Sequence, residues 1–426
     1  MRTKLPVLAA ILIVALGCSK EEAKQAADKA GDAVANAAGK AGDALDIAVP
    51  IRGTDDPKAR EQERFNEEWR QLESIRQAQA AKAQVPRAPE APAVNVTFLP
   101  NGKESFEGLD ANKILSAPVV VPLKGDVSGP SVLKTQVYLD RLNFSVGALD
   151  GRWGRNSAIA LWWYQRSRGI NATEPGALDE QTYRTLAAQA GGVPALVQRT
   201  LTEDDVKGPF EQIPEDVYDK AKLDCLCYES IKEKLAERFH TSQDFLEQIN
   251  PDVTFGELKA GDQIWAPNVR EAITTDRPDI DRVQISIRGN TFNAFDAQGN
   301  LVFHSPTTLG NKYDPSPSET VDVKKITFDP HFHYQPTLFA EVPDDEPEAN
   351  LSPGPNSPVG VVWVALSKPH FGIHGTSDPE SIGYASSHGC VRLTNWDAND
   401  VARRLRPGVK VEFVDTRTGQ KMASAR

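Results

Sequence analysis

The sequence places a histidine and a cysteine sixteen residues apart near its C-terminal end, at His374 and Cys390. A cysteine thiol with its ordinary pKa of about 8.5 is only a few per cent ionised at neutral pH. A neighbouring imidazole can accept the proton and leave a thiolate, and the imidazolium can later protonate a leaving amine. The pair therefore predicts acyl transfer or hydrolysis, with Cys390 as the nucleophile and His374 as the general base and acid.

Glycine residues stand beside both members of the pair, Gly375 after the histidine and Gly389 before the cysteine. Because glycine has no side chain, the backbone at these positions can approach a substrate closely. We expect the amides of Gly389 and Cys390 to face an oxyanion that develops during acyl transfer, to which one such donor contributes about 3–4 kcal/mol. The glycines therefore strengthen the prediction of a nucleophilic cysteine.

Two other interpretations of these residues are open. A single cysteine near a histidine can simply belong to a hydrophobic core. His370 and His374 are four residues apart, which is also the spacing of a zinc pair on a helix. Pro369 and Gly372 disfavour a helix at this point, so the sequence predicts no metal site here. The other nearby histidines, which we expect in a groove or on the surface, are His331 and His333.

The full pattern around the pair is Phe371-Gly-Ile-His-Gly-Thr376, followed by Ser386-Ser-His-Gly-Cys-Val-Arg-Leu393. It resembles the L,D-transpeptidase catalytic domain, a family whose signature is a His-Gly-Thr strand followed by Ser-His-Gly-Cys-x-Arg. The resemblance covers residues 280–415, and includes Gly354-Pro-Asn-Ser-Pro-Val-Gly360 and Trp363. It predicts a mostly-β catalytic domain for this part of the chain.

The resemblance implies a role for each residue of the pattern. Cys390 would be the nucleophile, His374 the general base and acid, and the Gly375 carbonyl would orient the imidazole. The other residues implied in the catalytic and substrate-binding site are Gly389, His388, Ser387 and Arg392. Family members often have a Pro-x-Gly turn after the early strands, whereas this chain has Asp314-Pro-Ser-Pro-Ser-Glu319. We therefore expect the substrate groove to have its own shape at that turn.

The resemblance also implies a reaction. The cysteine would attack the carbonyl of the third, diamino-acid residue of a peptidoglycan stem tetrapeptide, release the terminal D-Ala and form a thioester. An amine of another stem would then resolve the thioester, and no cofactor is implied. With water as the acceptor the enzyme would be an L,D-carboxypeptidase or a cross-link hydrolase, and with a lipoprotein amine it would be a ligase. Acylation by carbapenem-type compounds is a further expectation.

The elements that must position these residues are mainly strands. Apolar stretches punctuated by glycine, proline and asparagine, as in an all-β fold, recur at Val283–Ile287, Val361–Leu366 and Val409–Phe413. One helix is predicted from Trp396 to Leu405, with Asn395 as its N-cap. The expected class is a multidomain α+β chain whose catalytic domain spans residues 280–415.

Residues 126–192 have the pattern of a small helical domain. Helical runs occupy Val132–Leu142, Ala158–Arg166 and Asp179–Ala188, and glycines form a tight turn between the first two. The segment resembles the three-helix peptidoglycan-binding domain. The motifs that carry the resemblance are Gln136-x-x-Leu139, Asp150-Gly151-x-Trp153-Gly154, Tyr164-Gln165 and Leu178-Asp179-x-x-Thr182. A helical spacer with a similar turn is the alternative.

Residues 222–269 predict a βααβ module. Ser230-x-x-Glu233 and Thr241-x-x-Asp244 are capping patterns that begin two helices, and Gly261–Pro267 is a turn followed by a strand. The module resembles a lysin motif, which binds glycans that contain N-acetylglucosamine. The resemblance rests on Leu235–Phe239, Leu246, Asn250 and Leu258-x-x-Gly261. The usual opening Gly-Asp-Thr-Leu is absent, so use as a structural spacer is an equal alternative.

The cysteines are too few for a disulfide scaffold, although an exported chain would meet an oxidising compartment. Cys225 and Cys227 would face opposite sides of an extended segment, so a bridge between them would be strained. A metal site would need more ligands than the nearby His240 provides. We expect free or buried thiols at these two positions.

The N-terminus has the pattern of an export signal. Arg2 and Lys4 precede an apolar stretch from Leu5 to Leu16, which is too short to cross a bilayer core of about 30 Å. The stretch ends in Ala15-Leu16-Gly17-Cys18, which resembles a lipobox. Residues 1–17 are therefore predicted as a lipoprotein signal peptide and Cys18 as the lipidated residue. An ordinary signal peptide with an incidental cysteine is the alternative.

Residues 18–125 are expected to form a partly helical tether, with a charged helix at 56–84 stopped by Pro86–Pro92, and residues 416–426 a short tail. The net charge of −11 argues against nucleic acid as a partner. Membrane attachment would come through acyl chains on Cys18, and Ser19 points to an outer membrane facing the periplasm. A binding protein that joins this membrane to peptidoglycan, with a vestigial catalytic domain, is the rival hypothesis.

Overall fold

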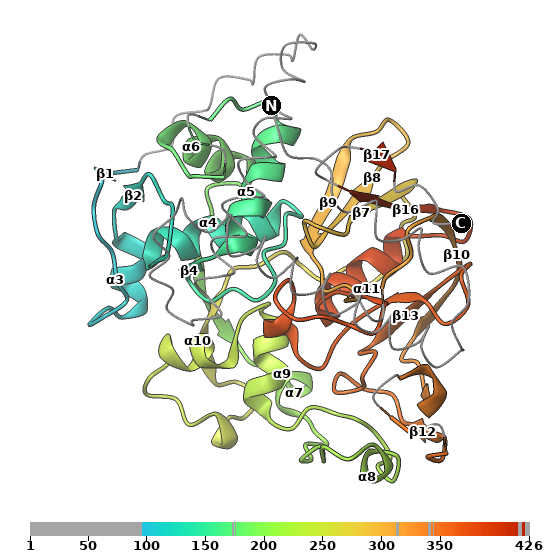
Figure 1. The fold of residues 1–426 in the computed structure, drawn as a ribbon. Coiled ribbons are helices and arrows are strands. Elements are labelled where there is room, and N and C mark those ends of the chain that lie inside the picture. The colour runs from blue at the N-terminus through green and yellow to red at the C-terminus, as the bar shows by residue number, and fades with distance from the viewer. Residues whose placement is uncertain are drawn as a thin grey trace, which may run out of the picture. The chain divides into compact units, whose positions relative to one another are not determined.

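The computed structural model describes residues 96–415, apart from 173, 175, 312–314, 340–341 and 344, together with residues 420–421. The predicted signal peptide, Cys18 and the predicted helix at residues 56–84 lie outside the described residues. Figure 1 shows helical units and a part built around a large sheet, which confirms the expected multidomain α+β class. Within the described ranges, no helix is both long enough and apolar enough to cross a bilayer.

Nine strands form one sheet in the C-terminal part, in the order β15-β14-β13-β10-β16-β7-β8-β9, with β17 paired to β16. Val283 and Ile285 are fully buried and Gln284 between them is half-buried, which is the alternation of a strand with one face in a core. The strands are β7 (Arg282–Ser286), β8 (Thr291–Phe295), β9 (Leu301–Pro306), β10 (Thr320–Phe328), β13 (Val362–Leu366), β14 (Gly372–His374), β15 (Val391–Arg392), β16 (Lys410–Asp415) and β17 (Gln420–Lys421).

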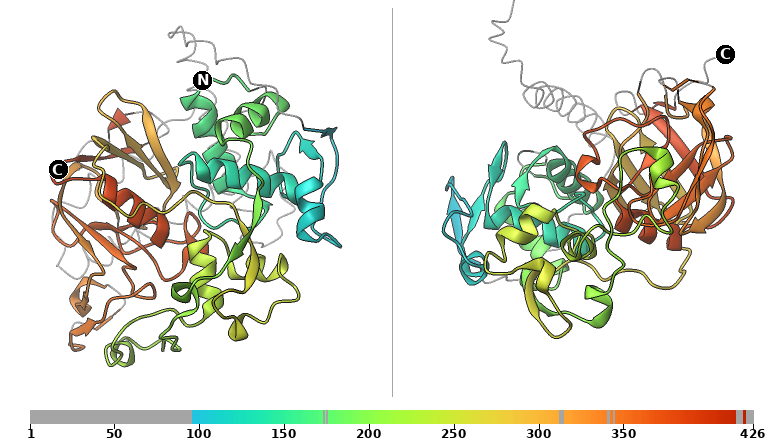
Figure 2. Two further views of the ribbon diagram at one scale, coloured as in Figure 1. Left: turned by 180° about the vertical axis from the view of Figure 1, so that it is seen from behind. Right: turned by 90° about the horizontal axis from the view of Figure 1, so that it is seen from below.

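Helix α11 (Asn395–Arg404) packs on this sheet, and Val401 and Ala402 belong to the same hydrophobic core as the strands (Figures 1 and 2). Its N-cap is Thr394, whose hydroxyl accepts a hydrogen bond from the Asp397 amide at 3.2 Å. The prediction of Asn395 as the cap is wrong by one residue, because the extended backbone lies at Thr394. The Asn395 side chain is therefore available for other contacts.

Three helices form the predicted helical domain: α4 (Pro130–Arg141), α5 (Arg155–Ser167) and α6 (Glu180–Gln189). The turn between α4 and α5 is held by Gln136, whose Oε1 accepts a hydrogen bond from the Gly151 amide at 2.8 Å. Gly151 has a φ of +66°, a conformation that glycine adopts without strain. Helix α6 begins after Asp179, whose carboxylate accepts a hydrogen bond from the Thr182 amide at 2.7 Å.

Regular structure is already present before residue 126 in the described part of the chain. Strand β1 (Phe98–Pro100) pairs in parallel with β2 (Val119–Val121), and helix α3 (Ala111–Ser116) lies between them in sequence. Ile114 and the three valines of β2 are buried in the core of the helical domain. The prediction of a tether up to residue 125 is therefore wrong for residues 98–123, because this apolar run completes the core of the neighbouring domain.

The βααβ arrangement is present, but its first strand lies earlier than predicted. Strand β5 (Leu196–Thr200) pairs antiparallel with β6 (Gln263–Pro267), and helices α9 (Ile231–Arg238) and α10 (Gln243–Gln248) lie between them in sequence. Ser230 caps α9 as predicted, accepting a hydrogen bond from the Glu233 amide at 3.1 Å. The cap of α10 is Ser242 rather than Thr241. The module therefore begins near residue 196, and residues 201–229 form a long insertion between β5 and α9.

Cys225 and Cys227 form a disulfide bond, so the expectation of free or buried thiols is wrong. The expectation assumed an extended segment, whereas these residues are irregular and their Cα atoms are 5.2 Å apart. Leu226 between them is fully buried, and its amide donates to the Pro353 carbonyl at 2.9 Å. We call residues 211–229, which contain α8 (Val217–Lys220), the strap. The strap packs on the hairpin of β11 (Phe332–Tyr334) and β12 (Ala349–Leu351).

A buried ion cluster joins the helical domain, the segment after β6 and the catalytic domain. The guanidinium of Arg270 pairs with Asp140 of α4, with Asp397 at 2.5 Å and with Asp400 at 2.8 Å. Burial disfavours the arginine cation, but the three carboxylates outweigh that cost and raise its pKa. Because breaking one partner of a buried ion pair leaves an uncompensated charge, this cluster holds the three units together.

Candidate active site

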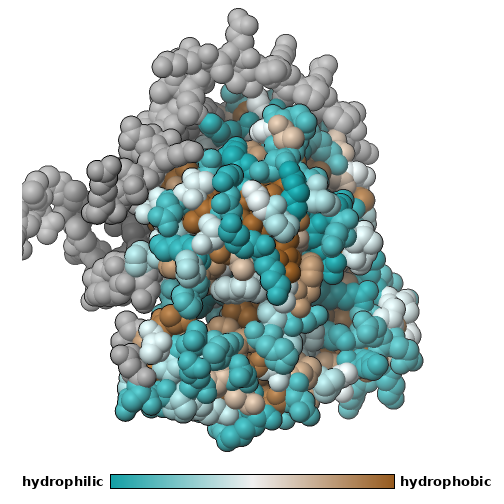
Figure 3. Space-filling model, turned by 90° about the vertical axis from the view of Figure 1, so that its right-hand side faces the viewer, coloured by the Kyte–Doolittle hydropathy of each residue, from teal (hydrophilic) through white to brown (hydrophobic). Residues whose placement is uncertain are grey.

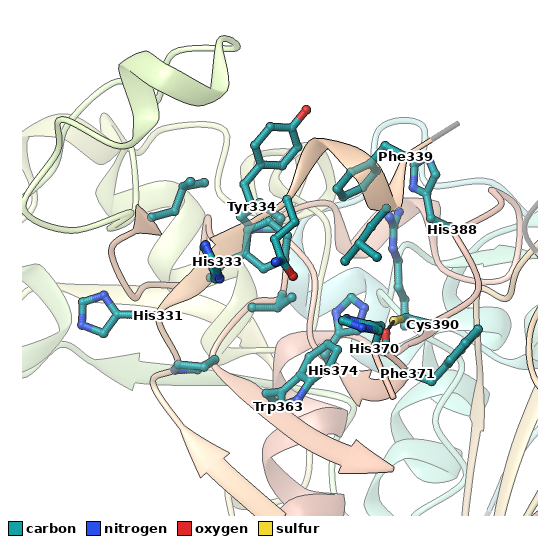
Figure 4. A pocket seen from close by; sticks show the side chains of 18 of the residues that line it. His331, His333, Tyr334, Phe339, Trp363, His370, Phe371, His374, His388 and Cys390 are labelled. Carbon is teal, nitrogen blue, oxygen red and sulfur yellow. Dashed lines mark hydrogen bonds between the residues drawn. The ribbon is translucent and has the colours of Figure 1, made fainter. Parts of the chain in front are cut away.

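Strand pairing brings close together the predicted base, His374, and the predicted nucleophile, Cys390, which are sixteen residues apart in the sequence. Strands β14 and β15 run in parallel, with Ile373 opposite Val391 and His374 opposite Arg392. Cys390 immediately precedes β15, so its side chain emerges beside β14. Figure 4 shows the His374 and Cys390 side chains next to each other in one cavity. The fold therefore brings together the two residues on which the sequence-based prediction of chemistry rests.

The imidazole of His374 is held in one orientation. Its Nδ1–H donates to the Gly375 carbonyl at 2.7 Å, and the ring stacks on Trp363 with 5.5 Å between centroids. With Nδ1 occupied, Nε2 keeps its lone pair and can act as a base. Burial, and secondly the charge of Arg392, lower the pKa of this histidine to about 3, although the Gly375 contact acts in the opposite sense. The imidazole is therefore neutral at physiological pH.

The thiol of Cys390 is half-buried and makes no disulfide. It donates a weak hydrogen bond to the His370 carbonyl at 3.7 Å. Burial raises the pKa of the thiol, while the Gly372 amide and Arg392 lower it to a lesser degree. Both pKa shifts favour a neutral thiol beside a neutral imidazole. The resting pair thus differs from the thiolate–imidazolium pair expected from the sequence, because burial penalises both charged forms.

The loop before Cys390 is fixed by the hydroxyl groups of two serines. The Ser387 Oγ donates to the Cys390 carbonyl at 2.7 Å and accepts a hydrogen bond from the Gly389 amide at 3.2 Å. Ser316 adds a second clamp, since its Oγ donates to the Gly389 carbonyl at 2.7 Å and accepts from the Gly310 amide at 2.9 Å. Ser316 lies in the turn that departs from the family pattern, and its part in the site was not predicted.

Gly389 occupies a position where any side chain would clash with its surroundings. Its φ is +105°, and a Cβ built there would lie 2.7 Å from the ring of Phe371. Its amide donates to the Ser387 Oγ, and the backbone amide that contacts the thiol is that of Gly372. The Gly389 amide is therefore already engaged with Ser387, and the Cys390 amide remains a candidate donor to an oxyanion.

A cavity of about 840 Å³ opens around the pair (Figure 4). Two of its lining residues, Val217 and Lys220, come from the strap, outside the catalytic domain. Among the lining residues in the described part of the chain, there is no aspartate or glutamate. The charged and imidazole groups that line it are Lys220, Lys368, Arg392, His331, His333, His370, His374 and His388. In a chain of net charge −11, this is a locally basic cavity suited to carboxylate-bearing ligands.

The remaining predicted site residues lie at different depths in the cavity. Arg392 lines it, and its Nε is buried without a hydrogen-bond partner among the described residues. His388 is exposed and packs edge-to-face on Phe339 at 5.0 Å. This position at the rim suits contact with a substrate rather than proton transfer at the thiol. His333 Nε2 contacts a Glu348 carboxylate at 2.9 Å.

On the face of the molecule seen in Figure 3, hydrophilic side chains predominate and apolar ones gather near the middle. Leu338 is one of the large apolar side chains that are exposed within the described residues, and it also lines the cavity. Exposed apolar groups at the mouth of a cavity are typical of a ligand site. No group of three histidine, cysteine, aspartate or glutamate residues in the described ranges is placed to hold a metal ion.

The fold and the site define a cysteine–histidine enzyme with a curled-sheet catalytic domain beside a helical domain. The family model of the L,D-transpeptidase catalytic domain (YkuD) matches residues 281–413, and that of a putative peptidoglycan binding domain matches residues 128–186. The chain is 31% identical over 182 residues to a putative L,D-transpeptidase YkuD of Bacillus licheniformis, covering 42% of this chain and 92% of that protein. The chain belongs to the L,D-transpeptidase family and is an enzyme of that class.

Other relatives match shorter segments. A probable L,D-transpeptidase YbiS of Escherichia coli is 37% identical over 62 residues, which are 15% of this chain and 20% of that protein. Among solved structures, L,D-transpeptidase 3 of Mycobacterium tuberculosis in complex with a faropenem-derived adduct is 18% identical. It covers 37% of this chain and 76% of that chain, with a TM-score of 0.27.

Proposed function

We propose that the chain is a peptidoglycan L,D-transpeptidase that forms a thioester between Cys390 and a stem tetrapeptide and transfers it to an amine. The observation that carries the proposal is the fixed tautomer of His374. Because its Nδ1–H is held by the Gly375 carbonyl, the basic Nε2 is available to the neighbouring thiol. Membership of the family and the match to a peptidoglycan-binding domain supply the substrate class.

Acylation begins from the neutral pair. The Cys390 sulfur attacks the carbonyl carbon of the third stem residue while its proton passes to the His374 Nε2. The oxyanion that forms is met by the Cys390 amide. When the tetrahedral intermediate collapses, the carbon–nitrogen bond to D-Ala breaks and the imidazolium gives its proton to the departing amine. The products of this half-reaction are a thioester, free D-Ala and a neutral imidazole.

Deacylation reverses these roles. An amine from a second stem peptide attacks the thioester carbonyl, and His374 accepts the proton that the amine loses. The carbon–sulfur bond then breaks, and the imidazolium returns its proton to the Cys390 sulfur. If water takes the place of the amine, the same steps give an L,D-carboxypeptidase or, on a cross-linked substrate, a hydrolase. A lipoprotein amine would make the enzyme a ligase.

The basic lining of the cavity supports a peptide that carries several carboxylates. Arg392 is half-buried beside the thiol and Lys220 lies on the strap side, so they can meet different carboxylates of one bound stem. The aromatic rings of Trp363, Phe371 and Phe339 provide apolar contact between these charges. A binding site of this kind selects by charge and by shape together.

The envelope location is part of the same proposal. Residues 1–17 would be removed as a signal peptide, and acyl chains on Cys18 would anchor the protein in the outer membrane, facing the periplasm. The peptidoglycan-binding domain and the βααβ module would then hold glycan strands near the cavity. Mass spectrometry of the N-terminal peptide of the purified protein would reveal acylation of Cys18. An unmodified Cys18 in the mature protein would exclude this anchor.

The proposed reaction is tested with tetrapeptide-bearing muropeptides and mass spectrometry. The wild-type chain should release D-Ala and, with a second stem present, yield a cross-linked dimer. The Cys390→Ala variant should do neither, and a Ser116→Ala variant, which removes an exposed hydroxyl that bonds only within α3, should behave as wild type. Release of D-Ala by the Cys390→Ala variant would exclude the proposed nucleophile. Inactivity of the wild type as well would favour a binding protein that joins membrane to wall.

A further inference from the structure

Asn395, the first residue of α11, ties together two loops that flank the catalytic histidine. Its Oδ1 accepts hydrogen bonds from the Thr376 amide at 3.1 Å and from the Val361 amide at 3.3 Å. Thr376 follows the Gly375 whose carbonyl orients the imidazole. The Asn395 amide group therefore lies one residue from the contact that fixes the His374 tautomer.

Two glycines admit the Asn395 side chain to this position. A Cβ at Gly375 would lie 2.1 Å from its Oδ1, and a Cβ at Gly360 would lie 2.0 Å from the same atom. Real Cβ atoms do not approach an oxygen so closely, so both positions require glycine for steric reasons. The packing leaves Asn395 little freedom to shift without displacing the Gly375 backbone.

The other end of the Asn395 amide is held from outside the catalytic domain. Its Nδ2 donates to the carboxylate of Glu237 at 2.9 and 3.2 Å and to the Pro355 carbonyl at 3.1 Å. Glu237 belongs to α9 of the βααβ module, 158 residues away in the sequence. Both side chains are buried. These contacts fix which end of the amide is the oxygen, and so direct Oδ1 to the two backbone amides.

A buried carboxylate without a cation is costly, and within the described residues no lysine or arginine pairs with Glu237. Its polar neighbours are the Asn395 amide, the Tyr228 hydroxyl at 3.2 Å and the carboxylate of Glu233 on the same helix. Burial raises the pKa of Glu237 to about 8; Asn395 and Tyr228 oppose the shift, and Glu233 adds to it. An apolar side chain would be buried at less cost, so the carboxyl group points to a use as a hydrogen-bond acceptor.

We infer that Glu237 is a positioning residue for catalysis, which acts through Asn395 on the Gly375–Thr376 backbone and thereby on the orientation of His374. The βααβ module thus braces the active site, whether or not it also binds glycan. The inference rests on the proposed function of the Cys390–His374 pair. Without the acceptor at position 237, the amide of Asn395 can rotate, and the Gly375 carbonyl is no longer held against the imidazole.

The test compares three substitutions in the full-length chain. Glu237→Leu removes the oxygens that accept from Asn395. Glu237→Asp shortens the side chain by one methylene, and Glu237→Gln replaces the carboxyl group with an amide that still has one acceptor oxygen. We expect the first two to lower kcat for D-Ala release roughly tenfold to a hundredfold with little change in KM, because misplacement of a catalytic group by about 1 Å has effects of this size. Glu237→Gln should keep kcat within about threefold of wild type.

The control is Glu247→Leu on α10 of the same module, where the glutamate is exposed and pairs with Lys232 at 2.8 Å. It should leave kcat and KM unchanged. A loss of thermal stability in the Leu and Asp variants with an unchanged kcat would overturn the inference. So would a Gln variant as impaired as the Leu variant, because hydrogen-bond acceptance would then not be what matters.

A second measurement does not depend on the substrate. The rate at which iodoacetamide alkylates Cys390 near neutral pH reports how well His374 accepts the thiol proton. We expect this rate to fall in the Leu and Asp variants and to be retained in the Gln and Glu247→Leu variants. If the wild type releases no D-Ala, the proposed reaction fails, but the alkylation rates still decide the inference. Equal alkylation rates in all variants would overturn it.

Discussion

His374 and Trp363 face each other across the antiparallel pair of β13 and β14, with their rings stacked at 5.5 Å and inclined by 25°. Directly opposite residues are close neighbours in a sheet, so the register of these strands sets the contact. The indole covers one face of the imidazole while the Gly375 carbonyl holds its Nδ1–H. His374, the proposed general base, is thus fixed by a ring on one side and a hydrogen bond on the other.

Removing the indole should lower the reaction rate. In a Trp363→Leu variant the imidazole would lose its stacking partner and gain freedom to rotate, so we expect kcat to fall roughly tenfold. Steady-state release of D-Ala measures the effect. The control is Trp265→Leu, which changes a half-buried tryptophan on β6 of the βααβ module and should leave kcat unchanged. An unaltered kcat in the Trp363→Leu variant would show that the hydrogen bond alone positions the ring.

Lowering the pH should destabilise the fold through two buried histidines. Burial lowers the pKa of His374 and of His304 from 6.5 to about 3. In the unfolded chain both regain the ordinary value, so between these pH values the unfolded state binds more protons than the folded state. The contribution of these two histidines to the free energy of unfolding is therefore fully present above pH 6.5 and is lost as the pH decreases, by up to about 1.4 kcal/mol per pH unit for each histidine. The raised pKa of Glu237 acts in the opposite direction, so the histidine contribution is measured by comparison with a variant.

Urea unfolding at about pH 7, 6 and 5 checks this dependence. A His304→Gln variant keeps an acceptor and donor near Asn293, which contacts the His304 Nδ1 at 2.8 Å, but cannot titrate. Its stability should lose about half of the histidine-dependent slope while the active site stays intact. An identical change in stability between pH 7 and pH 5 in the wild type and in the His304→Gln variant would contradict the burial of His304 as a neutral group.

The Ser316 clamp should matter for catalysis as well as for stability. A Ser316→Ala variant loses the hydrogen bonds to the Gly389 carbonyl and from the Gly310 amide, and we expect a stability loss of about 1–2 kcal/mol. Because Gly389 precedes Cys390, the proposed nucleophile, kcat should fall several-fold as well. Ser381→Ala is a matched control, since that hydroxyl donates to the Asp378 carbonyl at an exposed turn. If both variants lost stability and kcat to the same extent, the hydrogen bonds of Ser316 would have no specific effect on catalysis.

Loosening the strap should weaken substrate binding. In a Cys225→Ser/Cys227→Ser variant, Leu226 is less firmly held against the hairpin, and Val217 and Lys220 no longer form a fixed wall of the cavity. We expect KM for the tetrapeptide to rise roughly threefold to tenfold, which corresponds to a loss of about 0.7–1.4 kcal/mol in binding, with kcat nearly unchanged. Steady-state kinetics separate the two constants. A KM equal to that of wild type would show that the strap does not contribute to substrate binding.

The sequence was sufficient for features that depend on local pattern. The Phe371–Thr376 and Ser386–Leu393 motifs predicted the family, which the match to residues 281–413 confirmed, and the match to residues 128–186 confirmed the predicted peptidoglycan-binding domain. The three helices of the peptidoglycan-binding domain were predictable because their periodicity and the Asp179 cap act within a few residues. Errors of one residue, at Thr394 and Ser242, arose where two adjacent residues could both act as a cap.

Only the tertiary structure decided the features that depend on distant residues. The burial that keeps His374 and Cys390 neutral comes from strands paired across the sheet, and no local signal reports it. The Cys225–Cys227 bond spans Leu226, which is buried against Leu351 and bonds through its amide to a carbonyl more than a hundred residues away in the sequence. The contact of Glu237 with Asn395 joins residues 158 positions apart. Sequence pattern encodes which groups can react, whereas long-range packing determines their protonation and their partners.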